Sequence, residues 1–255
     1  MTGRSMKDWD AAAMDWSSQL TAGYDRVREE YNWPAFEAMI GLVTGLEVVD
    51  LGCGDGDVTR RLARSGATVT GIDPSEQMIA VARALTQSGD IHYEVVPQEA
   101  PFAGLPNSST DLVVSFMGVM SMRDLTPIAV GAARVLRPGG RLALALLHPC
   151  FSHSGMAWRK NNDGSILLEL SRYATVSDVP GSITFQTTRE NDGSSFAVSR
   201  QERTLSSVLT PFLSENLHLT SFEEPQPSAE AVETNRHLRR WRDVAPAFLH
   251  LEFKR

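Results

Sequence analysis

A run of nine residues, Val48-Val49-Asp50-Leu51-Gly52-Cys53-Gly54-Asp55-Gly56, carries the strongest structural signal of this 255-residue chain. Its apolar first half predicts a buried strand, and Val58–Arg64 after the glycines predicts a helix. Glycines at such a junction allow a tight turn and let backbone N–H groups approach a ligand closely. Their spacing is Gly-x-Gly-x-Gly, whereas the fingerprint of dinucleotide-binding proteins is Gly-x-Gly-x-x-Gly. That fingerprint would require a glycine at position 57, which is Asp57 in this chain. The turn therefore predicts a ligand site and disfavours NAD.

Strands and helices alternate on both sides of this turn, from residue 46 to residue 147. The expected strands are Val48–Leu51, Val69–Ile72, His92–Val96, Asp111–Phe116 and Arg141–Leu147, and the expected helices are Val58–Arg64, Ser75–Leu85 and Leu125–Leu136. This alternation predicts a parallel sheet with helices on both faces. Ligands bind such sheets at the carboxyl ends of the strands.

The alternation stops at residue 149. Residues 149–203 are rich in Ser, Asn and Gly, with turn signals at Asp163-Gly164, Pro180-Gly181 and Asp192-Gly193. Within them, Ile183–Thr188 and Phe196–Ser199 are predicted to pair as a hairpin. The remaining elements expected are a helix over Leu205–Glu215 capped by Thr204, strands over Leu217–Phe222 and Ala247–Phe253, and a long connection over Glu223–Ala245 with a short helix.

The composition excludes several classes of protein. Lys plus Arg number 24 and Asp plus Glu 31, so the net charge of −7 argues against a nucleic-acid partner. Two cysteines and six histidines without ligand spacing predict neither a disulfide framework nor a metal site. The N-terminus has no apolar segment typical of a secretory signal, and the longest apolar run, Leu142–Leu147, is too short to span a bilayer. We therefore expect a cytoplasmic protein without a membrane partner; its oligomeric state is left open.

A second motif, Gly71-Ile72-Asp73-Pro74, closes the next predicted strand. Asp73 lies 21 positions after Gly52, and an acid at such a strand end can accept both hydroxyls of a ribose. Pro74 then opens the following helix. Taken alone, the motif is equally compatible with an aspartate that caps a helix.

Together, these motifs resemble those of the class I S-adenosylmethionine-dependent methyltransferases. The matching pieces, in order, are Val48–Gly56, Gly71–Met78, Leu105–Val114 and Leu136–Arg141, and the resemblance covers residues 8–150 well. It implies an α/β, Rossmann-like, seven-stranded and mostly parallel sheet with helices on both faces. It also implies S-adenosyl-L-methionine as cofactor and S-adenosyl-L-homocysteine as product. The resulting single domain comprises N-terminal lid helices (1–45), a cofactor-binding core (46–148), a substrate cap inserted after strand five (149–203) and a C-terminal helix with two strands (204–255).

The resemblance also assigns roles to individual residues. Asp50, Gly52, Cys53, Gly54 and Gly56 would hold the methionine part, Asp73 and Pro74 the ribose, and Met78 the adenine. An acid usually accepts the adenine amino group; here Gln98, followed by Glu99, takes that position, and a shift of two residues would place Val96 there. A glutamine carbonyl can accept the same hydrogen bond. Ser115 and Phe116, at the end of strand four, would touch cofactor and substrate.

The N-terminal segment Trp9–Trp16 resembles the family's lid helix Tyr-Asp-x-x-Ala-x-x-Tyr, with tryptophan in place of both tyrosines. The two indoles would shield the sulfonium, because an aromatic face attracts a cation. Tyr24 and Tyr31 follow and could supply the phenol that tryptophan lacks. The alternative is that Trp9 and Trp16 only fix the helix to the domain.

His148 follows strand five and is the candidate general base, since an unperturbed imidazole titrates near neutral pH. The alternative is a structural histidine that bonds a loop carbonyl. The run Arg236–Arg242, which contains His237, is predicted to be a solvated helix face.

We expect methyl transfer to an N, O or C nucleophile of a small organic molecule, in the manner of secondary-metabolite tailoring. The segment Ser115–Gly118 lacks the (Asn/Asp)-Pro-Pro-aromatic motif, which disfavours a nucleobase amine as acceptor. Three alternatives stay open: an RNA or protein methyltransferase, a non-methylating protein of this fold that binds S-adenosylmethionine, and an NAD-dependent Rossmann protein.

Overall fold

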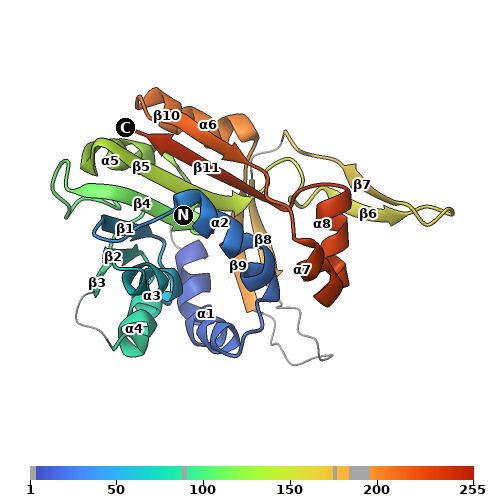
Figure 1. Ribbon diagram of the computed structural model, residues 1–255, viewed down its shortest axis with the longest axis horizontal. Coiled ribbons are helices and arrows are strands. Elements are labelled where there is room, and N and C mark those ends of the chain that lie inside the picture. The colour runs from blue at the N-terminus through green and yellow to red at the C-terminus, as the bar shows by residue number, and fades with distance from the viewer. Residues whose placement is uncertain (1–3, 88–90, 175–176, 184–195) are drawn as a thin grey trace.

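The computed structural model describes residues 4–87, 91–174, 177–183 and 196–255 (Figure 1). Its centre is a seven-stranded sheet in the order β10-β11-β5-β4-β1-β2-β3. The strands are β1 (Glu47–Leu51), β2 (Thr68–Asp73), β3 (Ile91–Val95), β4 (Thr110–Phe116), β5 (Leu136–Leu147), β10 (His218–Glu223) and β11 (Phe248–Lys254). β11 pairs antiparallel with both of its neighbours, and the other pairs are parallel. The seven-stranded, mostly parallel α/β sheet predicted from the sequence is confirmed.

Helices cover both faces of the sheet. On one face, α5 (Thr126–Val135) and α6 (Leu205–Ser214) bury Ile128 and Phe212 completely. On the other, α2 (Trp33–Ile40) and α3 (Asp57–Arg64) bury Phe36 and Leu62. α4 (Glu76–Leu85) packs beside β2 and β3. The apolar runs of β4 and β5 are buried because both faces of the sheet are covered.

Two predicted helix caps are confirmed. The Ser75 hydroxyl accepts the Met78 N–H at 3.1 Å at the start of α4. The Thr204 hydroxyl accepts the Ser207 N–H at 3.2 Å at the start of α6. Each cap satisfies one of the N–H groups that the first helical turn leaves without a partner.

Strand β5 is longer than the predicted Arg141–Leu147, because it begins at Leu136. Leu136 pairs with Thr110, and the register then shifts before Leu112 pairs with Arg141. The extra residues around Gly139 and Gly140 form an irregularity in the strand, and the pairing of β5 with β4 resumes at Arg141.

The inserted segment forms two hairpins where one was predicted. β6 (Met156–Lys160) pairs with β7 (Ile166–Leu170) around the predicted Asp163-Gly164 turn, where Gly164 has φ +87°. β8 (Ser177–Ile183) pairs with β9 (Phe196–Glu202). This second hairpin corrects the expected pairing of Ile183–Thr188 in two ways: its first strand ends at Ile183, and Pro180-Gly181 lies inside that strand instead of forming a turn. A two-stranded hairpin tolerates proline because its outer edge needs no N–H donor. Residues 184–188 and Asp192-Gly193 lie outside the described residues.

Helices at both ends of the chain complete the molecule. α1 (Arg4–Thr21) packs against α4 and β9, and a π-helical turn (Arg28–Asn32) leads into α2. The predicted connection near the C-terminus holds α7 (Ala229–Thr234), a 3-10 turn (Arg236–Leu238) and α8 (Arg239–Asp243). A second 3-10 turn covers Val119–Ser121. None of the described helices is long and apolar enough to cross a membrane.

Candidate active site

A cavity of about 440 Å³ lies at the carboxyl ends of the central strands. Asp50 of β1, Asp73 of β2, Phe116 of β4 and Leu147 of β5 line it. Side chains of α1, β9 and α8 line it as well, so segments far apart in the sequence enclose the same space. This is the edge at which α/β sheets bind ligands.

The glycine turn shapes one wall of the cavity. Gly54 has φ +56°, and a Cβ built on it would meet only the Met78 sulfur, at 4.0 Å. Backbone at this position therefore faces open space in which a ligand can approach. Gly56 has φ +77°, and its Cβ would lie 2.4 Å from the Tyr93 hydroxyl. A side chain at position 56 would therefore clash with Tyr93, which explains the glycine. Gly56 does not line the cavity.

Asp73 is held by two backbone donors. Its Oδ2 accepts the Gly54 N–H at 3.0 Å and its Oδ1 accepts the Ser75 N–H at 2.8 Å. Burial raises the pKa of Asp73 to about 6, and these two donors oppose the rise. Each carboxylate oxygen keeps a further lone pair, so Asp73 can still accept ligand hydroxyls.

Asp50 lies at the end of β1 below the turn and is almost completely buried. Its Oδ2 accepts the Thr59 hydroxyl at 2.7 Å. Burial raises the pKa of Asp50 to about 7, although Thr59 and the nearby charge of Arg28 oppose the rise. A cationic group bound in the cavity would favour its ionised form.

Arg28 also lines the cavity and contributes a guanidinium to its wall. This residue was not identified from the sequence. Its Nη2 donates to Asp57 at 2.7 Å, and its Cζ lies 4.8 Å from the centre of the Phe116 ring. Its buried Nε has no hydrogen-bond partner within the described part of the chain. That Nε lies 3.9 Å from the Glu29 carboxylate, and the guanidinium has five N–H donors in all, so Arg28 can still donate to an anionic ligand group in the cavity.

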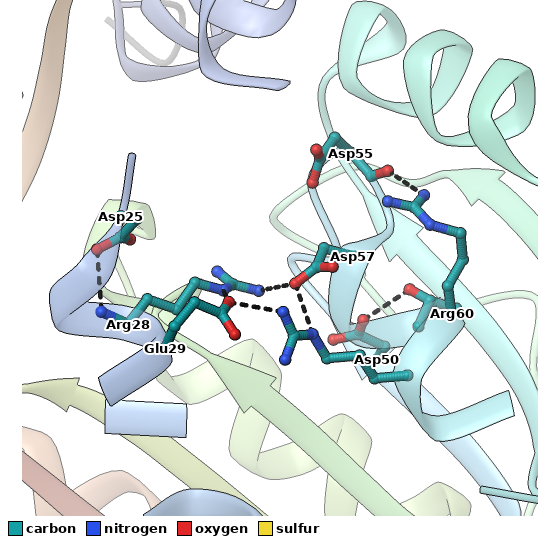
Figure 2. Close-up of polar contacts among 9 residues, drawn as sticks. Asp25, Arg28, Glu29, Asp50, Asp55, Asp57 and Arg60 are labelled. Atoms are coloured by element: carbon teal, nitrogen blue, oxygen red, sulfur yellow. Dashed lines mark hydrogen bonds and ion pairs between the residues drawn. The ribbon is translucent and has the colours of Figure 1, made fainter. Parts of the chain in front are cut away.

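Figure 2 shows the network that fixes Arg28. Asp25 accepts the Arg28 backbone N–H at 3.0 Å, and burial raises the pKa of Asp25. Arg61 binds Asp57 at 3.0 Å and Glu29 at 2.6 Å. Burial alone would raise the pKa of Asp57, but the guanidinium groups of Arg28 and Arg61 outweigh it and lower this pKa. The network holds the π-helical turn against α3.

Aromatic side chains of α1 also line the cavity. The rings of Trp9 and Trp16 meet edge to face, with centroids 5.2 Å apart and planes at 83°. The Trp9 indole N–H donates to the Ser121 hydroxyl at 3.0 Å. Asp10 accepts the Ser75 hydroxyl at 2.5 Å and the Gln77 N–H at 3.3 Å, which ties α1 to the start of α4. Tyr24, just after α1, lines the cavity too.

The structure brings most of the predicted cofactor residues together. Those that line the cavity are Trp9, Trp16, Tyr24, Asp50, Gly52, Cys53, Gly54, Asp73, Pro74, Met78, Gln98 and Phe116. Gly56, Glu99 and Ser115 do not line it: Glu99 is exposed, and the Ser115 hydroxyl donates to the Leu51 carbonyl at 2.7 Å. Val96, the alternative to Gln98, packs in the hydrophobic core.

His148, the predicted base, lies outside the residues that line the cavity. It is buried, and its Nδ1 accepts the Cys150 N–H at 3.1 Å. That bond leaves the proton on Nε2, which donates to Glu224 at 2.8 Å. Both ring nitrogens are thus engaged in holding the loop after β5. Tyr31 is also bonded within the protein: its hydroxyl donates to the Pro225 carbonyl at 2.6 Å and accepts the Ala247 N–H at 3.3 Å.

The run Arg236–Arg242 differs from the predicted solvated face. His237, Arg240 and Trp241 line the cavity, while Arg236 and Arg239 are exposed. No spacing rule relates these residues to the cavity, because their contacts depend on where α8 packs. No group of three or more His, Cys, Asp or Glu side chains suited to a metal occurs among the residues that the structure describes.

Comparison with known proteins relates this site to methyltransferases. Residues 48–140 match the family model described as a methyltransferase domain. A demethylmenaquinone methyltransferase from Tropheryma whipplei is 37% identical over 141 residues, which are 52% of this chain and 58% of the relative. A ubiquinone biosynthesis O-methyltransferase from Methylobacterium sp. is 34% identical over 106 residues, 42% of this chain and 43% of the relative. The chain thus spans about half the length of the curated relatives it matches.

A solved structure extends the similarity over most of the chain. The S-adenosylmethionine dependent methyltransferase from Mesorhizobium loti superposes with a TM-score of 0.73 at 28% sequence identity. The superposition covers 88% of this chain and 97% of that chain. The arrangement of sheet and helices is therefore shared well beyond residues 48–140.

Proposed function

We propose that this chain, a member of the class I S-adenosylmethionine-dependent methyltransferases, transfers a methyl group from S-adenosylmethionine to a small organic molecule. The observation that carries the proposal is one continuous cavity that joins the Gly54–Asp73 wall to the aromatic wall of α1. Its volume of about 440 Å³ falls within the range typical of small-molecule sites.

The residues present fit this cofactor. Asp73 would accept the ribose hydroxyls, and Gln98 and Met78 would contact the adenine from the same wall. The Arg28 guanidinium lines the cavity and has more donors than its bond to Asp57 uses, so it would donate to the cofactor carboxylate, and Asp50 lies nearby to favour its ammonium group. Open space at Gly54 allows the backbone to come close to the ligand.

The bound cofactor supplies an electrophilic methyl on a sulfonium, whose leaving group is a neutral thioether. The chain therefore has to align the acceptor and exclude water more than it has to protonate a leaving group. Trp9 and Trp16 would exclude water and present aromatic faces to the sulfonium. An acceptor that must lose a proton would find Asp25 or Tyr24 in the cavity wall, and burial brings the pKa of Asp25 closer to the working pH of a base.

The names of both curated relatives refer to acceptors of the quinone class, which supports a small molecule as the acceptor. The net charge of −7 supports the further proposal that nucleic acid is not the acceptor. The finer proposal, that the reaction tailors a secondary metabolite in the cytoplasm, draws its support from the resemblance to stand-alone tailoring methyltransferases. Panels of quinone precursors and of phenolic metabolites would distinguish these acceptors.

The first test is binding of S-adenosylmethionine, S-adenosylhomocysteine and NADH, measured by thermal shift and calorimetry. At 100 times its dissociation constant, a ligand should stabilise the fold by about 2.7 kcal/mol. We expect stabilisation by the two adenosyl ligands alone, and a loss of affinity of about 1–3 kcal/mol in Asp73→Asn, whose amide replaces one acceptor oxygen by a donor. Asp163→Asn, in the exposed turn of the β6–β7 hairpin, is the matched control.

Stabilisation by NADH alone would contradict the proposal. Binding of S-adenosylmethionine without formation of S-adenosylhomocysteine, across acceptor panels that include tRNA, would instead indicate a non-methylating member of the fold.

A further inference from the structure

Arg240 is a cation of the cavity wall that has no anionic partner among the residues that the structure describes. The other arginines that line the cavity each pair with a carboxylate: Arg26 with Glu30, Arg28 with Asp57, and Arg200 with Glu202. Within the described ranges, Arg240 makes no ion pair, and its buried Nε has no hydrogen-bond partner. Burial lowers the pKa of Arg240.

Two tryptophans hold the guanidinium in place. The Cζ of Arg240 lies 5.3 Å from the centre of the Trp158 ring and 5.4 Å from that of Trp241. The two rings meet edge to face, 5.0 Å apart at 84°. Aromatic faces attract the cation but offer its N–H groups no strong acceptor, so the hydrogen-bonding capacity of Arg240 stays available.

This arrangement is assembled from distant parts of the chain. Trp158 comes from β6 of the inserted segment, whereas Arg240 and Trp241 come from α8. Figure 1 shows α8 on the opposite side of the molecule from α4, which begins just after Asp73. Trp241, which follows Arg240 in α8, packs in the same hydrophobic cluster as Phe248 and Leu147, so apolar surface lies beside this part of the cavity wall.

A half-buried, unpaired guanidinium is costly unless an anion neutralises it. The planar fork of arginine matches a carboxylate through two parallel hydrogen bonds. The aromatic and aliphatic side chains around it suit a flat, apolar body. We propose that the methyl acceptor is an aromatic carboxylate and that Arg240 binds its carboxylate group. This inference rests on the proposed function, because it names the substrate class of the same cavity.

The test is calorimetric binding of matched probes to the complex with S-adenosylhomocysteine. The pairs are 3,4-dihydroxybenzoate against catechol, and indole-3-carboxylate against indole. We expect the carboxylated member of at least one pair to bind about tenfold more tightly or better, the scale of hydrogen bonds to a charged group. Arg240→Met, which keeps an apolar stem, should abolish that preference, and Arg240→Lys should retain part of it.

Arg239→Met is the matched control, because it removes the same charge from the exposed side of the same helix. It should leave the preference unchanged. The inference is overturned if neither carboxylate binds preferentially to the wild type, or if the preference persists in Arg240→Met. All variants should bind S-adenosylhomocysteine with unchanged affinity, which shows that they are folded. Failure of the wild type to bind S-adenosylhomocysteine would count against the proposed function instead.

Discussion

Asp73 shows how the environment of a single residue sets a measurable property of the site. Its carboxyl is buried between two backbone N–H donors, and its pKa is raised to about 6. Ribose hydroxyls would donate to the ionised carboxylate, so ligand binding should lower this pKa. Binding should then be coupled to proton release near pH 6.

The probe for this coupling is 5′-methylthioadenosine, which has the ribose and adenine but lacks the titrating amino group of the full cofactor. Its affinity should rise between pH 5 and pH 7, approaching about tenfold per pH unit below pH 6, and level off above pH 7. Calorimetry in two buffers of different ionisation enthalpy should detect proton release at pH 6, which Asp73→Asn should remove. An affinity that is flat or falls with pH would refute the ribose role.

His148 is expected to act on stability and not on methyl transfer. Removing its ring in His148→Ala leaves the Cys150 N–H and the Glu224 carboxylate without their partner. We expect a loss of about 1–3 kcal/mol in urea unfolding, with cofactor affinity and turnover of the folded protein close to wild type. His148→Asn should recover part of this loss, because its side-chain oxygen can still accept the Cys150 N–H. Abolished turnover in a stably folded His148→Asn would restore the histidine as the general base.

At the scale of elements, α1 forms part of the cavity wall through Trp9 and Trp16. The helix is tied to α4 by Asp10 and to β9 by Asp8, whose carboxylate accepts the Ser199 hydroxyl at 2.6 Å. These are polar contacts at the rim of a small apolar cluster that includes Ala12 and Val198. Such a contact surface suits a lid that opens without unfolding the core.

Asp10→Ala should therefore loosen α1 and speed the release of S-adenosylhomocysteine. The loss of two hydrogen bonds at a partly exposed site predicts an increase in the dissociation rate of about five- to thirtyfold. Stopped-flow tryptophan fluorescence measures this rate, because Trp9 and Trp16 lie in the cavity wall. Asp15→Ala, on the exposed side of the same helix, is the control. An unchanged dissociation rate would mean that Asp10 does not hold the lid closed.

At the scale of the whole molecule, the cavity is confined to one edge of the sheet, and some elements have no contact with it. The cavity lies at the carboxyl ends of the strands, while α6 and β10 line no part of it. Hydrogen exchange with saturating S-adenosylhomocysteine should therefore slow most in α1 and in residues 50–56 and 73–78. Protection in α6 and β10 should rise only as far as the global stability rises. Preferential protection of α6 would place the ligand elsewhere.

The core and half of the site follow from local sequence. The Gly-x-Gly-x-Gly turn, the acid that ends β2 and the caps at Ser75 and Thr204 were predictable, because each depends on backbone conformation and hydrogen bonds among residues a few positions apart. The mostly parallel α/β sheet also followed, since strands that alternate with helices favour parallel pairing. Such features are determined by residues that lie close together in the sequence.

Other features in and around the site depend on packing between distant segments. Arg240 contacts Trp158 across 82 positions, and Glu224 reaches His148 across 76, so no spacing rule relates them. Arg28 meets Asp57 because a π-helical turn packs on α3. The neighbours of each side chain determine its function. A charge that is paired within the protein is neutralised, whereas a buried charge without such a partner can bind a ligand. Local pattern thus specifies the cofactor-binding edge, whereas the folded arrangement of the inserted hairpins and the C-terminal helices specifies what can bind beside it.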